Sequence, residues 1–135
     1  MKRATLETQL GAMPLFDGLT PRQLAEVAGM VLDRSVKAGK PVIKAGNWGH
    51  EFLIVLEGEV EIWRDGRVVD TLGPGGHVGE LAVMSDARRN ATVIATTPVV
   101  VGAIEAGLFR SLIDDMPVLA ERIAANVSQY PPSAG

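Results

Sequence analysis

The chain has 135 residues, which is enough for one domain with a buried core and too few for two, so we expect a single domain over residues 1–135. Apolar residues make up 47% of the chain and the net charge is −3, which excludes a disordered chain and argues against a general nucleic-acid or membrane-surface binder. There is no cysteine, no apolar run of the roughly 18 residues that a membrane span needs, and no signal peptide, so we expect a cytoplasmic protein without disulfides or zinc–cysteine sites.

Helices are expected at the N-terminus, over about residues 2–30. Leu6 and Leu10 lie four residues apart, which indicates a short helix that breaks at Pro14. Leu15 and Phe16 then provide apolar side chains that we expect to insert into the body of the domain.

A second N-terminal helix has a clear start signal. Thr20 is a favourable N-cap, Pro21 suits the first helical position, and Gln23 completes a capping box. Leu19 and Leu24 are placed as a hydrophobic staple. One apolar face then follows, formed by Leu24, Val27, Ala28 and Val31.

From about residue 34 to 104 the pattern changes to short strands separated by turns. The run at 52–56 is entirely apolar, which favours a strand covered on both faces. Asp65-Gly66 is a hairpin signal. Glycine or proline also lies between the other runs, so the spacing favours a small barrel or jelly roll. The expected strands are 40–44, 52–56, 59–62, 67–69, 92–97 and 99–104.

Helical periodicity returns over about residues 105–128. One helix is expected up to Asp114-Asp115, and Pro117 opens another that ends before Tyr130. The apolar positions that mark these two helices are Leu108, Phe109, Leu112 and Ile113, and then Leu119, Ile123 and Val127.

Residues 78–93, which read VGELAVMSDARRNATV, carry the strongest functional signal. Gly79 has no Cβ, so a ligand or a tight turn can approach its backbone. Residues 80–84 suit one short helical turn, whose unpaired N–H groups bind anions. Arg89 adds a planar cation suited to phosphate, and the Glu80 carboxylate can accept hydrogen bonds from hydroxyls. The pattern indicates a nucleotide or sugar phosphate, with a surface salt bridge between the two side chains as the alternative.

This stretch resembles the phosphate-binding cassette of cyclic-nucleotide-binding domains, which occur in catabolite activators, kinase regulatory subunits and gated channels. The family's Gly-Glu-Leu-Ala stands at 79–82 and its Arg-x-Ala-Thr-Val at 89–93. The resemblance implies that Glu80 binds the ribose 2′-hydroxyl, and that Arg89 and the N–H groups of Ala82 and Ala91 bind the cyclic phosphate. The site residues expected from it are Gly79, Glu80, Leu81, Ala82, Arg89, Asn90 and Ala91.

Three positions depart from the family pattern. Val78 replaces an aromatic residue, and Arg88 replaces a proline, which makes the loop into the next strand less stiff and more basic. Asn90 stands where some cGMP-preferring members carry Thr or Ser, so the departures bear on base selectivity rather than on phosphate binding.

The resemblance implies a mainly β fold, a β-roll or jelly roll flanked by N- and C-terminal helices, with Gly39, Gly46, Gly58 and Gly75 at its turns. It also implies a non-catalytic sensor of cAMP, favoured over cGMP, with no metal or other cofactor and with a last helix (117–128) that moves over the base. Catabolite activators carry a helix-turn-helix beyond this helix, and few residues follow Val127 here. We therefore expect a free-standing sensor or a piece of a longer protein, without direct DNA or membrane binding, that acts through an effector protein in trans. The apolar face of the last helix could also form a homodimer.

Two other functions compete with this interpretation. A cupin-like enzyme could hold iron or manganese with His50, Glu57 and His77, although the paired His-x-His of cupins is absent. A degenerate domain that binds no nucleotide could serve only for docking, although Glu80 and Arg89 are both present.

The remaining polar and aromatic candidates have simpler explanations. Asp114 and Asp115, with Glu121 nearby, suit a charged helix start better than acid–base chemistry. Ser85 has no histidine placed to activate it. The aromatic residues Trp48, Trp63 and Tyr130 could stack on a base, but a loop contact, a barrel face and chain-end packing explain them as well.

Overall fold

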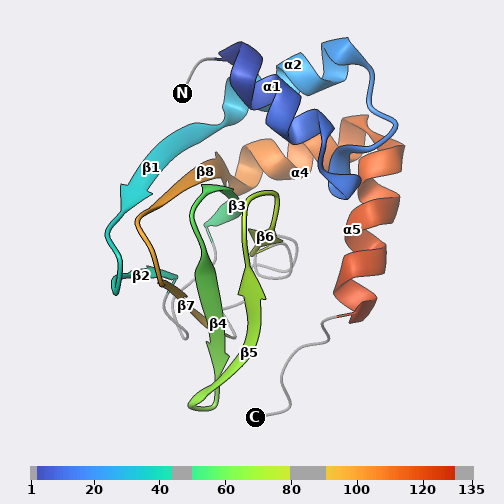
Figure 1. Cartoon of the computed structure of the whole chain (residues 1–135). Helices are drawn as coiled ribbons and strands as arrows, with labels where there is room; N and C mark the ends of the chain where they lie inside the picture. Colours follow the sequence, from blue (N-terminus) through green and yellow to red (C-terminus); the bar gives the residue numbers. More distant parts are fainter. Residues whose placement is uncertain (1–2, 44–49, 80–90, 130–135) are drawn as a thin grey trace.

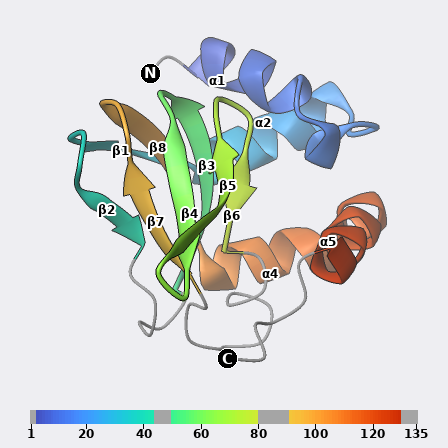
Figure 2. The same cartoon turned by 60° about the horizontal axis from the view of Figure 1, so that its bottom comes forward.

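Two antiparallel sheets pack face to face, and helices cover the outer face of one of them (Figures 1 and 2). The computed structural model describes residues 3–43, 50–79 and 91–129, and the side chains within 5–43, 50–79 and 91–123. This architecture confirms the predicted β-roll with flanking helices. No helix within the described ranges is long and apolar enough to cross a membrane.

Each sheet has four strands among the described residues. The first sheet has the order β1-β8-β3-β6, with bounds Leu32–Val36, Val99–Glu105, Glu51–Glu57 and His77–Val78. The second sheet has the order β2-β7-β4-β5, with bounds Pro41–Ile43, Thr92–Ala95, Val60–Arg64 and Arg67–Leu72. Consecutive strands mostly alternate between the sheets, so the chain winds around the space between them.

Strand β3 is buried on both faces, as its unbroken apolar sequence predicted. Phe52, Ile54 and Leu56 point to the helices, where they join the larger hydrophobic core. Leu53 and Val55 alternate with them and point into the space between the sheets. One strand therefore links the two cores of the domain.

The helices lie at the two ends of the chain. They are α1 (Arg3–Gly11), the 3₁₀ turn η1 (Pro14–Phe16), α2 (Pro21–Met30), α4 (Ala106–Asp115) and α5 (Pro117–Gln129). The predicted capping box of α2 is confirmed: the Gln23 N–H donates to Thr20 Oγ1 at 3.1 Å, and the Thr20 N–H donates to Gln23 Oε1 at 2.9 Å.

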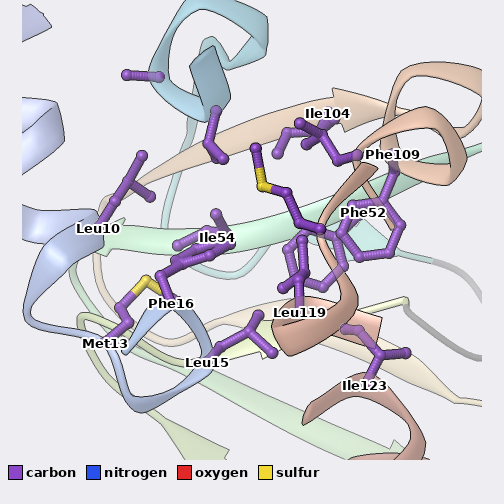
Figure 3. Close-up of a cluster of buried hydrophobic side chains, with 14 of the residues drawn as sticks. Leu10, Met13, Leu15, Phe16, Phe52, Ile54, Ile104, Phe109, Leu119 and Ile123 are labelled. Atoms are coloured by element: carbon purple, nitrogen blue, oxygen red, sulfur yellow. The ribbon is translucent and has the colours of Figure 1, made fainter. Parts of the chain in front are cut away.

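Large side chains fill the core between the helices and the first sheet (Figure 3). The rings of Phe52 and Phe109 stack with their centroids 4.2 Å apart, which fastens α4 to β3. Leu119 and Ile123 of α5 are fully buried in the same core. The predicted dimer through the apolar face of this helix therefore cannot use these two residues while α5 stays in this position, and the side chain of Val127 lies outside the described part of the chain.

One local prediction was wrong, one was confirmed in part of its detail, and one strand was missed. Strand β1 was not predicted, because its sequence LDRSV is polar and mostly exposed and becomes a strand only by pairing with β8. Val31 ends α2 as the C-cap and packs against the same core as Leu24, Val27 and Ala28, so the predicted apolar face is confirmed. Asp114 and Asp115 lie in the last turn of α4 rather than at a helix start, and α5 begins two residues after them.

Four short connections between the sheets lie at one end of the roll, which we call the turn end: residues 37–40, 58–59, 73–76 and 96–98. Three of the glycines predicted at turns have a positive φ there: Gly39 (+83°), Gly58 (+86°) and Gly75 (+92°). The fourth, Gly46, lies outside the described residues. At the opposite end, which we call the site end, the described chain stops at residues 43 and 79 and resumes at 50 and 91.

Candidate functional site

The predicted cassette leaves the first sheet and enters the second at the site end of the roll. Val78, the last residue of β6, pairs with Leu53, and Gly79 follows it directly. Ala91 precedes β7, whose Thr92 pairs with Trp63. Of the predicted site residues, the structure describes Gly79 and Ala91. The other predicted site residues, Glu80, Leu81, Ala82, Arg89 and Asn90, lie outside the described residues, as do Trp48, Ser85, Arg88 and Tyr130.

Gly79 has a φ of +97°, a backbone conformation that residues with a side chain rarely adopt. This angle fits the turn that the sequence predicted at this position, while close approach of a ligand stays a prediction. Ala91 is only 8% exposed, so the segment returns to the sheets at a buried residue. The predicted cassette thus leaves the first sheet at a glycine with a positive φ and rejoins the second sheet at a buried alanine.

Aliphatic side chains line the space between the sheets. Partly buried Val78, the last described residue before Gly79, packs against this cluster. All of these side chains are aliphatic, so the cluster is apolar and contains no charged group. Its buried members are Ile43, Leu53, Val55, Val60, Val93, Ala95, Val99, Val101 and Ala103. Each of these side chains is at most 8% exposed, so they form a packed apolar core, which Val78 joins beside the predicted cassette.

Arg64 is a candidate that the sequence interpretation passed over. Because Trp63 pairs with Thr92, the next position of β4 falls beside Ala91. Arg64 lies on the same face of β4 as Val60 and Ile62, whose side chains belong to the cluster between the sheets. Its Nε is shielded from solvent and has no hydrogen-bond acceptor among the described residues. The available sequence signal was a cation that ends an inward-facing row of aliphatic residues.

The start of α4 is tied to the residue that precedes β3. The Ala106 N–H donates to the His50 carbonyl oxygen at 2.8 Å. Glu105 caps the helix by accepting from the N–H groups of Gly107 at 3.0 Å and Leu108 at 3.2 Å. These bonds, that from Gly107 first, lower the pKa of Glu105 below its ordinary value of 4.5. The C-terminal helices therefore begin within the site end.

The ligands required for the cupin-like alternative are not brought together. His50 precedes β3 and Glu57 ends it, so they are separated by roughly 20 Å of extended strand. The His77 ring packs 5.5 Å from the ring of Phe52 instead. Within the described ranges, no group of three or more His, Asp or Glu side chains could hold a metal ion.

Comparison with known proteins agrees with this arrangement. The model of the family described as "Cyclic nucleotide-binding domain" matches residues 33–116. A cAMP-dependent protein kinase regulatory subunit from Yarrowia lipolytica is 37% identical over 101 residues, which cover 75% of this chain and 27% of that protein. The chain spans less than a third of the length of the curated relatives it matches first.

Two solved structures share the fold. A PKAR CBD2 with bound Sp-2Cl-cAMPS superposes with a TM-score of 0.84 at 26% identity, over 95% of this chain and 88% of the other. The catabolite activator protein of Thermus thermophilus superposes with a TM-score of 0.80 at 28% identity, over 86% of this chain and 57% of the other. Together with the family match over most of the chain, these likenesses show that the chain belongs to the cyclic nucleotide-binding domain family and is a regulatory domain of that kind.

Proposed function

We propose that the domain is a non-catalytic sensor that binds cAMP in preference to cGMP. The observation that carries the proposal is the position of Gly79 and Ala91, which bracket the predicted cassette at one end of the aliphatic cluster between the sheets. A cyclic nucleotide has a charged phosphate and an apolar base face, which need these two kinds of surface side by side. The relatives named for cAMP support the choice of ligand.

The proposed contacts divide the nucleotide into three parts. Arg89 and the N–H groups of Ala82 and Ala91 bind the singly charged cyclic phosphate, and Glu80 accepts from the ribose 2′-hydroxyl. The base lies against the aliphatic side chains between the sheets. Leu81, Gly79 and Asn90 shape the backbone around these contacts.

Calorimetry tests the phosphate contact. Removing one partner of a desolvated, hydrogen-bonded charge pair costs about 2–5 kcal/mol, so Arg89→Ala should weaken cAMP binding by roughly thirtyfold or more. The matched control is Arg22→Ala, since Arg22 is exposed on α2 and lies on the helical side of the first sheet. Equal affinities for Arg89→Ala and the wild-type protein would remove Arg89 from the site.

The ribose contact needs a comparison of two ligands. Glu80→Ala should weaken binding of cAMP and barely change binding of its 2′-deoxy analogue, because the analogue lacks the hydroxyl that the carboxylate accepts. Glu26→Ala, at an exposed position of α2, controls for a general loss of negative charge. Equal losses for both ligands would show that Glu80 acts elsewhere.

The same titrations identify the base. We expect tighter binding of cAMP than of cGMP. Binding of neither nucleotide by a folded protein would support the docking-module alternative, and stoichiometric iron or manganese in the purified protein would support the cupin-like one.

We further propose that ligand binding changes the position of α5. This helix is fastened to the N-terminal segment: Arg122 donates to the Pro14 carbonyl oxygen and lies 3.7 Å from Asp17 Oδ2. Detaching α5 would also expose Leu119 and Ile123, at about 1.5–3 kcal/mol each. Coupling free energies between sites are typically about 1–3 kcal/mol, so we expect a tilt or slide that keeps both side chains covered.

Spin-label distance measurements test this movement. The chain has no cysteine, so cysteines introduced at exposed Glu121 of α5 and exposed Thr71 of β5 would be the two labelling sites. Addition of cAMP should shift the distance distribution of this pair. A pair at Arg22 and Thr71 should not shift, because neither label lies on α5. An unchanged distribution for the first pair at saturating cAMP would contradict the movement.

The output of the sensor is proposed to be an effector protein that responds to the position of α5, without direct contact with DNA. A kinase-type effector is suggested by the regulatory subunits among the relatives. A cytoplasmic location stays a prediction from the sequence.

A further inference from the structure

The described sheets have four edge strands, and three of them are poor templates for another chain. Strand β6 has two residues, and β2 has three and begins with Pro41, which has no N–H to donate. Strand β1 is longer and carries exposed Leu32, but its Arg34 is already bound by both oxygens of Glu51, at 2.7 and 2.9 Å. Strand β5 remains, with six residues and pairing to β4 on one side.

Two apolar side chains are exposed near the middle of β5. Val68 is 43% exposed and Val69 is 51% exposed, which makes them two of the few large hydrophobic residues at the surface. The pairing of β4 with β5 shifts here, since Ile62 pairs with Asp70 while Trp63 pairs with Val68. Val69 is therefore an extra residue in β5, and this bulge accounts for the exposure of two consecutive valines.

The four residues of this edge, 67–70, read Arg-Val-Val-Asp and are complementary to themselves. If two copies of β5 pair antiparallel about an axis between Val68 and Val69, each Arg67 lies opposite an Asp70 and each Val68 opposite a Val69. The bulge makes the side chains compatible, because both valines are exposed while Asp70 pairs with inward-facing Ile62. The Asp70 carboxylate accepts from the Thr71 N–H at 2.8 Å, and a carboxylate can accept several further hydrogen bonds.

We propose that residues 67–70 of β5 form the contact of a symmetric homodimer, in which the second sheets of two chains join edge to edge. The partner at this edge is a second copy of the chain, because antiparallel pairing puts the Arg67 of each copy opposite the Asp70 of the other. A single pair of short strands buries less surface than stable dimers do, so the association is weak and reversible. We expect a dissociation constant between about 10 µM and 1 mM.

Sedimentation velocity across a concentration series tests the proposal. The wild-type protein should shift from monomer to dimer over the stated range, and a monomer throughout would overturn the proposal. Val69→Lys places two like charges at the contact and should keep the protein monomeric. Val118→Lys, at a 40% exposed position of α5, is the matched control and should dimerise like the wild type.

Charge-swap variants give the decisive result. Arg67→Glu leaves only acidic residues at the two charged positions and Asp70→Lys only basic ones, so each alone should dimerise at least about tenfold more weakly. Mixed together, they should form a 1:1 heterodimer close to wild-type affinity. Thermal unfolding of each variant shows whether it is folded. If Asp70→Lys does not fold, the single variants Arg67→Glu and Val69→Lys, each expected to weaken dimerisation, still test the proposal. A mixture of folded variants that stays monomeric, or dimerisation lost in Val118→Lys instead, would overturn the proposal.

Discussion

The two ends of the roll are built differently. At the turn end, short connections join the sheets, and hydrogen bonds tie neighbouring connections to each other. The N–H of Glu59 donates to Thr97 Oγ1 at 3.0 Å, and its carbonyl oxygen accepts from the N–H and hydroxyl of Thr96. At the site end, the connections from β2 to β3 and from β6 to β7 are longer, and the second contains the whole predicted cassette.

This difference separates two tasks. Short connections with turn residues fix the positions of the strands, whereas a long connection can vary its side chains without changing the frame. We therefore expect changes at the turn end to lower the free energy of unfolding and changes at the site end to lower ligand affinity first. Four tests by substitution, in order of decreasing effect on stability, examine this division.

Gly58→Ala should have the largest effect. Gly58 has a φ of +86°, and a Cβ there would lie 2.3 Å from the carbonyl oxygen of Pro98 and 2.9 Å from Thr97 Oγ1. Left-handed strain alone is about 1–2 kcal/mol, and displacing a backbone carbonyl adds to it, so we expect a loss of roughly 3 kcal/mol or more in urea denaturation. Gly66→Ala is the control, since Gly66 has a φ of +76° but no atom within 4 Å of the added Cβ. Equal losses of unfolding free energy in Gly58→Ala and Gly66→Ala would show that backbone strain alone, and not the close contact with Pro98 and Thr97, makes Gly58 necessary.

Gly79→Ala and Gly39→Ala compare the two ends directly. Their φ angles are +97° and +83°, so each should lose about 1–2 kcal/mol of unfolding free energy from strain. Of these two glycines only Gly79 belongs to the predicted cassette, so only Gly79→Ala should also weaken cAMP binding in calorimetry. A folded Gly79→Ala protein that binds cAMP with wild-type affinity would contradict a role for Gly79 in ligand binding.

The turn end was predictable from the sequence because its residues act locally. Positive φ at Gly39, Gly58 and Gly75 follows from the properties of single residues, and the capping box at the start of α2 is local in the same way. Strand β1 could not be found this way, since its polar residues are held in the sheet by β8, more than sixty positions later in the chain. Glu105 as the cap of α4 was also missed, because glutamate is not a preferred N-cap residue.

The site was predictable as a motif but not as a geometry. The spacing of Gly79, Glu80 and Arg89 identified the family, and the family model confirms that identification. The spacing of residues within one segment cannot predict which residues from other strands lie beside it. Arg64 is brought beside Ala91 by strand pairing alone, so no local pattern could place it there.

Thr97→Val tests the hydrogen bonds of the turn end. It removes the acceptor of the Glu59 N–H, so we expect a loss of about 0.5–1.5 kcal/mol in urea denaturation. Thr96→Val should lose less, because the Glu59 carbonyl oxygen keeps the bond from the Thr96 N–H at 3.0 Å. Neither variant should change cAMP affinity. A larger loss for Thr96→Val would reverse the assigned importance of the two hydroxyls.

Glu105→Gln tests the N-cap of α4, which lies at the site end but stabilises the fold instead of binding the ligand. We expect its effect on stability to be the smallest of the four tests. The carboxylate accepts from the Gly107 and Leu108 N–H groups, so its pKa is lower in the folded protein than in the unfolded one. The stability that ionised Glu105 contributes to the folded protein is therefore fully present above pH 4.5 and is lost as the pH falls through the pKa of the folded state. The wild-type protein should melt at a higher temperature than Glu105→Gln at pH 7, and the difference should shrink below pH 4.5. Glu105→Ala, which also removes the acceptor, should remain less stable than the wild type at both pH values. If the difference in melting temperature between the wild type and Glu105→Gln does not change with pH, the shape of the side chain rather than its charge makes this cap. The start of α4 would then not depend on the ionisation of Glu105.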